Sequence, residues 1–468
     1  MFAAVAQAAT VSVGPSDCSS SAVNSAISSA SDGDTVLLTC TGTTSWTSTV
    51  TIPSSKGITL QVQNGTNGTW NGGHTARTGV NFPLKIVVSS GATGIVIVAN
   101  VNKSLVRVSG FDFQNSGTSD PFFKVGGCGN GTANLGAFRI DNNYFDTISA
   151  VENVAIWSGQ AGGCQGQLWG LIDNNTFHNV YRASDTSYGP YNIQIWNYWH
   201  PSGINQCWGC NGWTDNDFAY GSEHEVFIED NLFEQTADAP GHIRHYISSE
   251  LGARYVSRYN TFINNFPDSN ADLHDAHGVC LVASNGAGAR GGEVYHNTIV
   301  GTGYDRGTQL RGGSWLVYDN TITSGAGDEI QFDEYRAGDS SMYGQCSSTG
   351  NLVLMPPWPV PSGAAWSASA AWKSQAATGG SDYQLPMQIF NTYVWNNRSP
   401  GGSVIMPAVD SRGVQSTYIK NGRDYFANAD GSEPSGISGY IPYAYPDPLE
   451  GHGSDAPVPP TGLTAAVR

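Results

Sequence analysis

The sequence predicts an all-β protein: a right-handed parallel β-helix with a short N-terminal capping helix and long loops. A short phrase centred on Asn returns at intervals of tens of residues, which is typical of a solenoid. The chain has 58 Gly in 468 residues and only 13% charged residues, which suits many strands and turns. The recurring segments favour β-branched and aromatic residues and have no helical periodicity, which argues against a helical repeat.

The recurring phrase aligns on its Asn in six places. The segments are RIDNNYF (139–145), LIDNNTF (171–177), FIEDNLF (227–233), VSRYNTF (256–262), EVYHNTI (293–299) and LVYDNTI (316–322). The aligned residues are Asn143, Asn175, Asn231, Asn260, Asn297 and Asn320, with spacings of 32, 56, 29, 37 and 23. The spacing of 56 leaves room for a degenerate copy. An earlier divergent copy, VSGFDFQ (108–114), has Phe111 in place of the Asn.

The residue types within the phrase suit two strands joined by a sharp bend. The residue three before the Asn and the residue two after it are mostly aliphatic or Phe, so both are expected to point inward. Asn suits the bend because it tolerates left-handed backbone angles and hydrogen-bonds locally. When coils stack, the Phe side chains are expected to form a column and the Asn side chains a hydrogen-bonded ladder. Each buried Phe or Ile contributes roughly 1.5–3 kcal/mol.

The segment AVNSAISSASDGDTVLL, residues 22–38, predicts the start of the solenoid. Val23, Ile27 and Ala30 fall on one face of a helix, which is expected to cover the first coil and protect its unpaired strand edge. We expect this N-terminal cap at about residues 17–35 of a single β-helix domain spanning 10–450. The last part of that domain, about 352–450, is expected to be irregular.

The two ends of the chain are expected to lie outside the domain. Residues 1–9, within MFAAVAQAATVSV, are interpreted as the remnant of a signal peptide or as an apolar arm. Residues 451–468, with PVPPTGLTAAVR, are interpreted as a Pro-rich linker or as the truncated start of a fibronectin type III-like module. No segment reaches the length of about 20 apolar residues that a membrane helix needs.

Eight cysteines indicate an exported, disulfide-bonded protein. Proximity in the chain suggests Cys18–Cys40, Cys128–Cys164, Cys207–Cys210 and Cys280–Cys346, although other pairings are open. The CWGC motif at 207–210 has a loop-like context, which favours a structural bridge over redox chemistry. The net charge of −17 and the scattered basic residues exclude a nucleic-acid binder as the main interpretation.

Further motifs carry a resemblance to a known group. They are GDTVLL (33–38), GARYVSRYNTF (252–262), HDAHG (274–278), LRGGSWLVYDNT (310–321), YVWNN (393–397), GRDYF (422–426) and GYIPYAYPDPL (439–449). Over roughly residues 20–450 the chain resembles secreted right-handed parallel β-helix proteins of the pectate-lyase-like superfamily, in a poorly characterised bacterial branch. The resemblance implies a fold and an extracellular setting, because the branch shares no single reaction. The full polygalacturonase motif set is missing, so that activity does not carry over.

A row of side chains is expected on the outside of the solenoid, two positions before each Asn. The row is Asp141, Asp173, Glu229, Arg258, Tyr295 and Tyr318. Stacked carboxylates repel one another unless they bind a cation or are protonated, so calcium bound by the three acidic residues is one hypothesis. The other hypothesis is a solvated face on which intervening coils separate the acidic residues. The two tyrosines are expected either to stack on sugar rings or to fill space against a loop.

Functional side chains are densest between residues 223 and 336, where six of the ten histidines lie. A polysaccharide lyase needs a base and a positive charge, for which His277 or Arg258 and Arg311 are candidates. A glycoside hydrolase needs two carboxylates, for which Asp238 and Asp275 are candidates. His242, Arg244 and His245 are candidates for substrate binding. The His-Gly and Arg-Gly-Gly motifs also have an alternative to a catalytic role, which is close backbone packing at their glycines.

Two hypotheses about function follow. The first is a secreted or cell-surface protein that engages carbohydrate, as a lyase or glycoside hydrolase acting on an acidic polysaccharide. The second is a non-catalytic surface or matrix protein, structural or adhesin-like, that self-associates. The central cluster of His, Arg and Asp favours the first, and the apolar N-terminal segment and the trailing linker favour the second.

Overall fold

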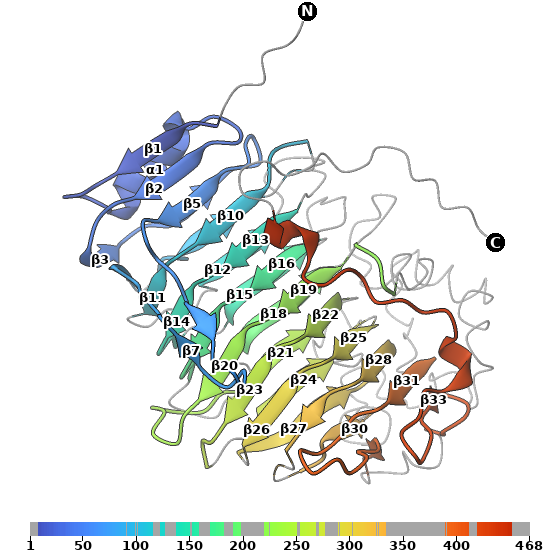
Figure 1. The fold of residues 1–468 in the computed structure, drawn as a ribbon. Coiled ribbons are helices and arrows are strands. Elements are labelled where there is room, and N and C mark those ends of the chain that lie inside the picture. The colour runs from blue at the N-terminus through green and yellow to red at the C-terminus, as the bar shows by residue number, and fades with distance from the viewer. Residues whose placement is uncertain are drawn as a thin grey trace, which may run out of the picture.

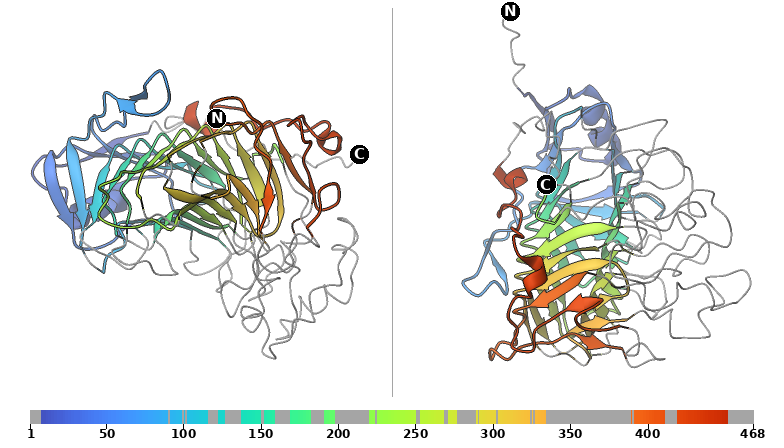
Figure 2. Two further views of the ribbon diagram at one scale, coloured as in Figure 1. Left: turned by 90° about the horizontal axis from the view of Figure 1, so that it is seen from below. Right: turned by 90° about the vertical axis from the view of Figure 1, so that its right-hand side faces the viewer.

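The protein is a parallel β-helix, seen in a computed structural model (Figure 1). The structure describes residues 8–89, 91–98, 100, 102–115, 122–126, 137–149, 152–158, 169–181, 191–197, 220–223, 225–249, 253–267, 271–276, 289, 291–301, 303–323, 325, 327–333, 389, 391–410 and 419–451. Three long sheets run along the solenoid, and every strand pairing within them is parallel. Figure 2 shows the coils stacked along one axis, with helix α1 (Ser20–Ser29) at the N-terminal end. The predicted fold class is confirmed.

The three sheets are named A, B and C. Sheet A contains β1 (Thr10–Val13), β2 (Thr35–Leu38), β5 (Thr59–Val62), β10 (Val106–Ser109), β13 (Phe138–Asp141), β16 (Gly170–Asp173), β19 (Val226–Glu229), β22 (Arg254–Arg258), β25 (Gly291–Tyr295), β28 (Ser314–Tyr318), β31 (Thr392–Trp395) and β33 (Tyr425–Phe426). Sheet B contains β3 (Gly42–Trp46), β8 (Leu84–Val88), β11 (Asp112–Asn115), β14 (Tyr144–Asp146), β17 (Thr176–His178), β20 (Leu232–Gln235), β23 (Thr261–Asn264), β26 (Thr298–Gly301) and β29 (Thr321–Ile322).

Sheet C completes each coil. It contains β4 (Val50–Ile52), β9 (Ile95–Ile97), β12 (Phe123–Gly126), β15 (Glu152–Ser158), β18 (Tyr191–Asn197), β21 (His245–Ser249), β24 (Ala271–Ala276), β27 (Tyr304–Leu310), β30 (Ile330–Phe332) and β32 (Ala408–Val409). A small antiparallel hairpin, β6 (Thr69–Trp70) with β7 (Arg77–Thr78), lies outside the three sheets.

The recurring phrase forms the corner between sheets A and B, and its Phe residues stack as expected. Phe145, Phe177, Phe233 and Phe262 are fully buried, with successive ring centroids 4.6–4.9 Å apart and almost parallel planes. Because each coil repeats the same contact, the gain from burying one aromatic ring is repeated along the solenoid.

The Asn residues form the expected ladder. Each amide nitrogen donates to the side-chain oxygen of the next Asn, at 2.8–3.1 Å, through Asn143, Asn175, Asn231, Asn260, Asn297, Asn320 and a seventh member, Asn397. Asn175 bonds directly to Asn231, and β16 pairs with β19, so the expectation of a hidden copy in the long spacing is wrong. Phe111 occupies the ladder position of the earlier coil, and its backbone N–H donates to Asn143 at 3.1 Å.

The left-handed backbone position of the corner is not the ladder Asn. It is the residue before it, with φ of 54° at Asn142, 53° at Asn174 and 56° at Tyr259. The ladder Asn is instead selected by its paired donor and acceptor, which an amide side chain alone supplies in this geometry. The reason given for Asn at the bend therefore needs this correction.

Helix α1 (Ser20–Ser29) caps the first coil. Ser19 is its N-cap, and the Ser19 side chain accepts a hydrogen bond from the backbone N–H of Ala22. Val23, Ile27 and Ala30 are buried as predicted. The Cys18–Cys40 disulfide joins the segment just before the helix to the segment just after β2. The other six cysteines, residues 1–7 and residues 452–468 lie outside the described residues, so their predictions stay predictions.

The C-terminal strap, residues 435–451 with the short helices η2 (Ser435–Ile437) and η3 (Pro448–Gly451), runs along the outside of sheet A (Figure 1). Arg258 donates to the carbonyl oxygens of Tyr443 and Ala444, and Arg139 to those of Leu449 and Glu450, all at 2.8–3.1 Å. The strap therefore buries the outer face of sheet A that carries the predicted outward row. In the described part of the chain, no helix is long and apolar enough to cross a membrane.

Candidate active site

The strongest cluster of functional side chains lies on sheet C. His245 begins β21, Asp272 is on β24, and Arg306 is on β27, and strand register places these three residues side by side in consecutive coils. Asp275 lies further along β24, and Arg311 follows β27 directly. These five residues, His245, Asp272, Asp275, Arg306 and Arg311, are called the His245 cluster below.

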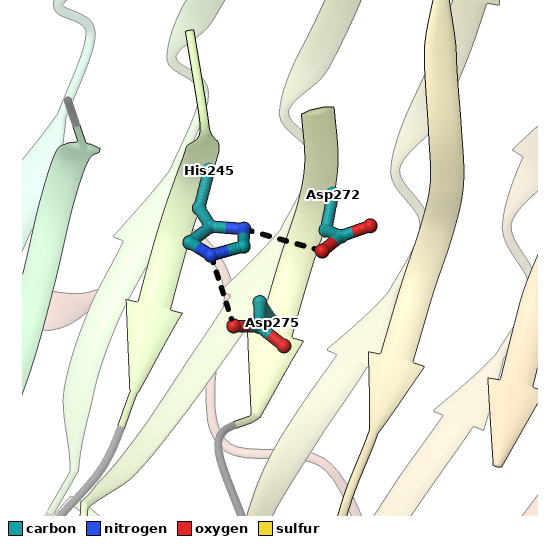
Figure 3. Close-up of side chains that lie close together, drawn as sticks. All are labelled: His245, Asp272 and Asp275. Carbon is teal, nitrogen blue, oxygen red and sulfur yellow. Dashed lines mark ion pairs between the residues drawn. The ribbon is translucent and has the colours of Figure 1, made fainter. Parts of the chain in front are cut away.

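His245 lies between two carboxylates of the next coil (Figure 3). Its Nδ1 is 3.4 Å from Oδ2 of Asp272, and its Nε2 is 3.2 Å from Oδ2 of Asp275. All three side chains are buried, with 2% of His245 and none of either aspartate exposed. Each ring nitrogen therefore faces a carboxylate, so an imidazolium formed when the ring takes up a proton would be stabilised on both sides.

Two arginines face the same carboxylates. Arg306 Nη1 lies 2.9 Å from Asp272 Oδ1, and Arg311 Nη2 lies 3.2 Å from Asp275 Oδ1 and 3.8 Å from Asp272 Oδ2. The two guanidinium groups balance the two buried negative charges, which would otherwise be costly to bury.

Burial has the largest effect on the ionisation of Asp272. Burial raises the pKa of Asp272 above the ordinary aspartate value, Arg306 and Arg311 work in the opposite direction, and the charge of Asp275 adds to the increase. Burial works to lower the pKa of Arg306, but Asp272, Asp305 and Asp333 together outweigh it and raise that pKa. A carboxyl group whose pKa is raised in this way is suited to acid–base chemistry near neutral pH.

Polar side chains extend the cluster along sheet C. Gln309 Nε2 donates to Asp333 Oδ2 at 2.8 Å, and Arg306 Nε donates to Gln331 Oε1 at 2.6 Å. On the other side, the ring of Tyr191 stacks on His245, with centroids 5.2 Å apart and planes 4° apart. The stacked Tyr fixes the orientation of the imidazole, which a positioned acid or base requires.

His245, Asp272 and Asp275 also form a donor set for a metal ion, since one atom of each lies within 4.8 Å of the others. However, the two nitrogens of His245 face different carboxylates, and only one of them can bind a given ion. The arginines also already balance the two aspartates. This arrangement suits proton transfer better than metal binding.

The structure brings four of the predicted site residues into or beside the cluster. Arg311, Asp275 and His245 are members. Arg244 precedes β21, its carbonyl oxygen accepts from the backbone N–H of Asp272 at 3.0 Å, and its charge acts on Asp272. The predicted roles of these residues stay predictions.

Other predicted site residues lie elsewhere. Arg258 is a fully buried partner of Glu229 on sheet A, not a member of the sheet C cluster. Asp238 is exposed in the turn after β20, and His242 packs edge-on to Phe266. His277 lies outside the described residues.

The two tyrosines expected to stack on sugar are covered. Tyr295 and Tyr318 are 2% and 4% exposed, and their rings stack on each other at 4.6 Å. Trp395 continues the stack, and Tyr440 of the strap bonds to the Tyr318 hydroxyl at 3.0 Å. The two tyrosines therefore fill space against a covering segment, which was the predicted alternative to stacking on sugar rings.

The acidic residues expected to bind calcium are paired with arginines. Asp141 accepts from Arg107 at 2.6 and 2.7 Å, and Asp173 accepts from Arg139 at 2.7 and 2.9 Å. Glu229 in turn lies 2.5 Å from Arg258. The expected solvated face is wrong, because all three carboxylates are buried. Calcium binding by Asp141, Asp173 and Glu229 stays a prediction, and these arginines compete with it. Glu229 also lies near Asp230 and Glu450, with one oxygen of each within 4.8 Å of the others.

Asp272 was missed at the sequence level because β24 does not alternate. Leu273 belongs to the core, and the next residue, His274, also faces inward, where its Nε2 lies 2.8 Å from Ser257 Oγ and burial lowers its pKa to about 4. Strict alternation would place Asp272 and Asp275 on opposite faces. Two consecutive inward residues bring both to the outer face instead.

Comparisons with known proteins give little beyond the fold. No protein-family model and no curated protein matches this chain. A solved alginate lyase from Paenibacillus sp. str. FPU-7 aligns at 13% identity over 67% of this chain and 94% of its own, with a TM-score of 0.31. A PL6 family polysaccharide lyase from Pseudopedobacter saltans aligns at 13% identity over 91% and 94%, with a TM-score of 0.34. Likeness at this level assigns neither a family nor an activity.

Proposed function

We propose that the protein is an extracellular enzyme that cleaves an acidic polysaccharide by elimination, with the His245 cluster as its acid–base centre. One observation carries the proposal: a buried imidazole lies between two carboxylates that two arginines also contact. A buried ion network of this composition adds little to stability relative to apolar packing, which favours a functional reason for it.

The chemistry of elimination matches these side chains. A base removes the proton from the carbon beside the uronate carboxylate, and the electron pair left there forms a carbon–carbon double bond. The bond to the neighbouring glycosidic oxygen breaks, and that oxygen takes up a proton. In the proposed mechanism, neutral His245 takes the first proton, and Asp272 and Asp275 then hold the imidazolium. Arg306 and Arg311 stabilise the negative charge that grows on the substrate carboxylate.

Hydrolysis is the weaker alternative for this site. Asp272 and Asp275 are close enough to act as a carboxylate pair, since their facing oxygens lie within 4.8 Å. A glycosidase, however, needs the space between its two carboxylates for the sugar and, in inverting enzymes, for a water. Here the His245 ring lies between them. Elimination uses that ring directly and is therefore preferred.

An extracellular location fits the single described disulfide. Cys18–Cys40 is of the kind that persists in oxidising compartments. The overall charge of −17 argues against unaided attraction of a polyanion, so the local arginines of the cluster have to supply it.

Incubation with a panel of polysaccharides tests the proposal. Polygalacturonate, alginate and hyaluronan serve as acidic substrates, and dextran as the neutral control. The expected result is ultraviolet absorbance from the new double bond, together with new reducing ends, on at least one acidic polymer. New reducing ends without the absorbance would replace elimination by hydrolysis. No product from any acidic polymer, with and without added calcium, would overturn the enzyme and favour the non-catalytic surface protein.

A further inference from the structure

A second set of ring and polar side chains lies at the corner between sheets A and B. Because the corner repeats in each coil, the residues before the ladder Asn form a row that begins with Asn142 and Asn174. Its later members, Asp230, Tyr259, His296, Asp319 and Asn396, are called the corner row below. The rings of Tyr259 and His296 lie 4.9 Å apart. His296 Nε2 lies 3.9 Å from Asp319 Oδ2, and Asn396 donates to the other oxygen of that carboxylate.

The C-terminal strap adds a fixed, exposed aromatic ring to this row. Tyr445 stacks on Tyr259, with centroids 3.7 Å apart and planes 22° apart. Its hydroxyl donates to both carboxylate oxygens of Asp230, at 2.9 and 3.1 Å. In spite of these contacts, 43% of Tyr445 is exposed, as is 39% of the His296 side chain. The rings are thus held in place before any ligand arrives, which lowers the entropic cost of binding.

The β6–β7 hairpin borders the corner row at the same point. Arg77 donates to the backbone carbonyl of Asp230 and, at 3.1 Å, to the Asn174 side chain. Its guanidinium lies 3.8 Å from the ring centroid of Trp70, on which His74 also stacks. The strap and the hairpin therefore both contact Asp230, the first residue of the corner row.

We propose that the corner row together with Tyr445 is a second polysaccharide-binding surface, which contacts sugar rings outside the His245 cluster. The apolar face of a pyranose ring packs on an exposed aromatic ring, and the carboxylate and amide groups of the next two coils accept and donate to its hydroxyls. Consecutive coils are about 4.8 Å apart, which is comparable with the length of one sugar residue in an extended chain. The polysaccharide ligand is taken from the proposed function, but catalysis is not needed.

The composition of the surface favours a sugar chain over a second copy of the protein. In the described part of the chain, the exposed large hydrophobic side chains are Val80, Met406, Ile441 and Tyr445, and only the last contacts the corner row. The core of a stable protein–protein interface requires more buried apolar surface than one such ring supplies. Isolated rings with polar neighbours suit a hydroxyl-rich ligand.

Binding measurements with the same polysaccharide panel test the inference. Affinity electrophoresis and titration calorimetry are done in the His245→Ala background, so that the polymer is not consumed. Tyr445→Leu removes the ring, and His296→Asn removes a ring without touching the strap while suiting a left-handed backbone. Each is expected to weaken binding about three- to tenfold. Tyr445→Phe keeps the ring and is expected to bind within about twofold of the parent.

The matched control is Ile441→Ala, which truncates the most exposed hydrophobic side chain of the strap (75%). It is expected to leave binding unchanged. Normal binding by both Tyr445→Leu and His296→Asn would overturn the inference, as would equal losses in Tyr445→Phe or Ile441→Ala. Binding of no polymer by the parent, or self-association abolished by Tyr445→Leu, would overturn it as well. If ring-dependent binding occurs but the wild-type protein forms no product, the proposed enzyme alone fails.

Discussion

Arg258 and Glu229 form a fully buried ion pair on sheet A, with Nε 2.5 Å from Oε2, under the C-terminal strap. The pair links three parts of the chain, because Arg258 also donates to two strap carbonyls and Glu229 accepts from the backbone N–H of Asp447. Burial works to lower the pKa of Arg258, but Glu229 and Tyr295 outweigh it and raise that pKa. Arg258 is thus a permanently charged attachment point.

Arg258→Met is expected to lower the free energy of unfolding by about 3–5 kcal/mol, because Glu229 remains buried without its partner. The strap is expected to become sensitive to limited proteolysis. Chemical denaturation and mass mapping of the cleavage sites measure both effects. Arg423→Met serves as the control, since its ion pair with Asp424 joins adjacent residues and the Arg423 side chain is 30% exposed. The Asp424 carboxylate also keeps its hydrogen bond from the backbone N–H of Lys420, so a smaller loss than in Arg258→Met is expected. A stable but inactive Arg258→Met protein would instead restore the catalytic role suggested by the sequence.

His245→Ala is expected to lower turnover on the active polymer about 10²- to 10⁴-fold, because it removes the proposed proton acceptor. The matched control is His178→Ala on sheet B. His178 also lies between two carboxylates, with Nδ1 2.9 Å from Asp146 and Nε2 3.9 Å from Glu234, but it is partly exposed and faces away from sheet C. Turnover is measured alongside thermal unfolding of each variant. Equal activity in the two variants would remove His245 from the mechanism.

Asn260→Ala is expected to lower the free energy of unfolding by about 2–4 kcal/mol. The side chain of Asn260 donates to Asn297 and to the carbonyl of Ile228, and it accepts from Asn231, so its removal leaves several buried groups unpaired. Urea denaturation measures the loss. Asn265→Ala is the control, since this side chain is exposed beyond the ladder. A similar loss in both variants would mean that the ladder adds nothing specific.

The features that recur in the sequence could be predicted, because one local rule generates them. The inward residues, the Phe column and the Asn ladder all follow from a single bend repeated in each coil. The long spacing before Asn231 was misjudged, since spacing alone does not distinguish a further coil from a long loop. Capping of the first coil by α1 could also be predicted, since an apolar helix face needs a surface to cover.

Contacts between distant segments could not be predicted. For the acidic part of the outward row on sheet A, a solvated face was one of two hypotheses, but the strap covers this row through contacts such as Arg139 with Glu450. Nothing in the alternation of a strand reveals which outer face a later segment will cover. The candidate site was located only to a region, because Asp272 reaches His245 through a local break in alternation on β24.

Two aspartates on sheet B are expected to respond to pH with opposite sign. Burial raises the pKa of Asp112 from 3.8 to about 6, with Lys85 working in the opposite direction. Burial alone would also raise the pKa of Asp146, but hydrogen bonds from His178 and Thr147 lower it below the ordinary value. The register places both on the outer face of neighbouring coils.

At high pH the ionised Asp112 carboxylate lowers the free energy of unfolding, because burial disfavours its charged form. As the pH falls from 6 towards 3.8, the folded protein takes up this proton before the unfolded chain does, so stability rises. Asp112→Asn is therefore expected to raise the free energy of unfolding at pH 8 by about 1–3 kcal/mol, and to have little effect below pH 4.

Asp146→Asn is the opposing variant. Because the folded protein holds the ionised form of Asp146 through its hydrogen bonds, that residue contributes stability above the unfolded pKa, and the contribution is lost as the pH falls through the lower, folded pKa. The variant is expected to be less stable than the parent at pH 7, with the difference disappearing in acid. Urea denaturation of both variants from about pH 2 to pH 8 measures the two slopes. A shift of stability in the same direction for both variants at pH 8 would contradict this account. The overall field of a chain with a net charge of −17, and not local burial and hydrogen bonding, would then set the ionisation of both aspartates.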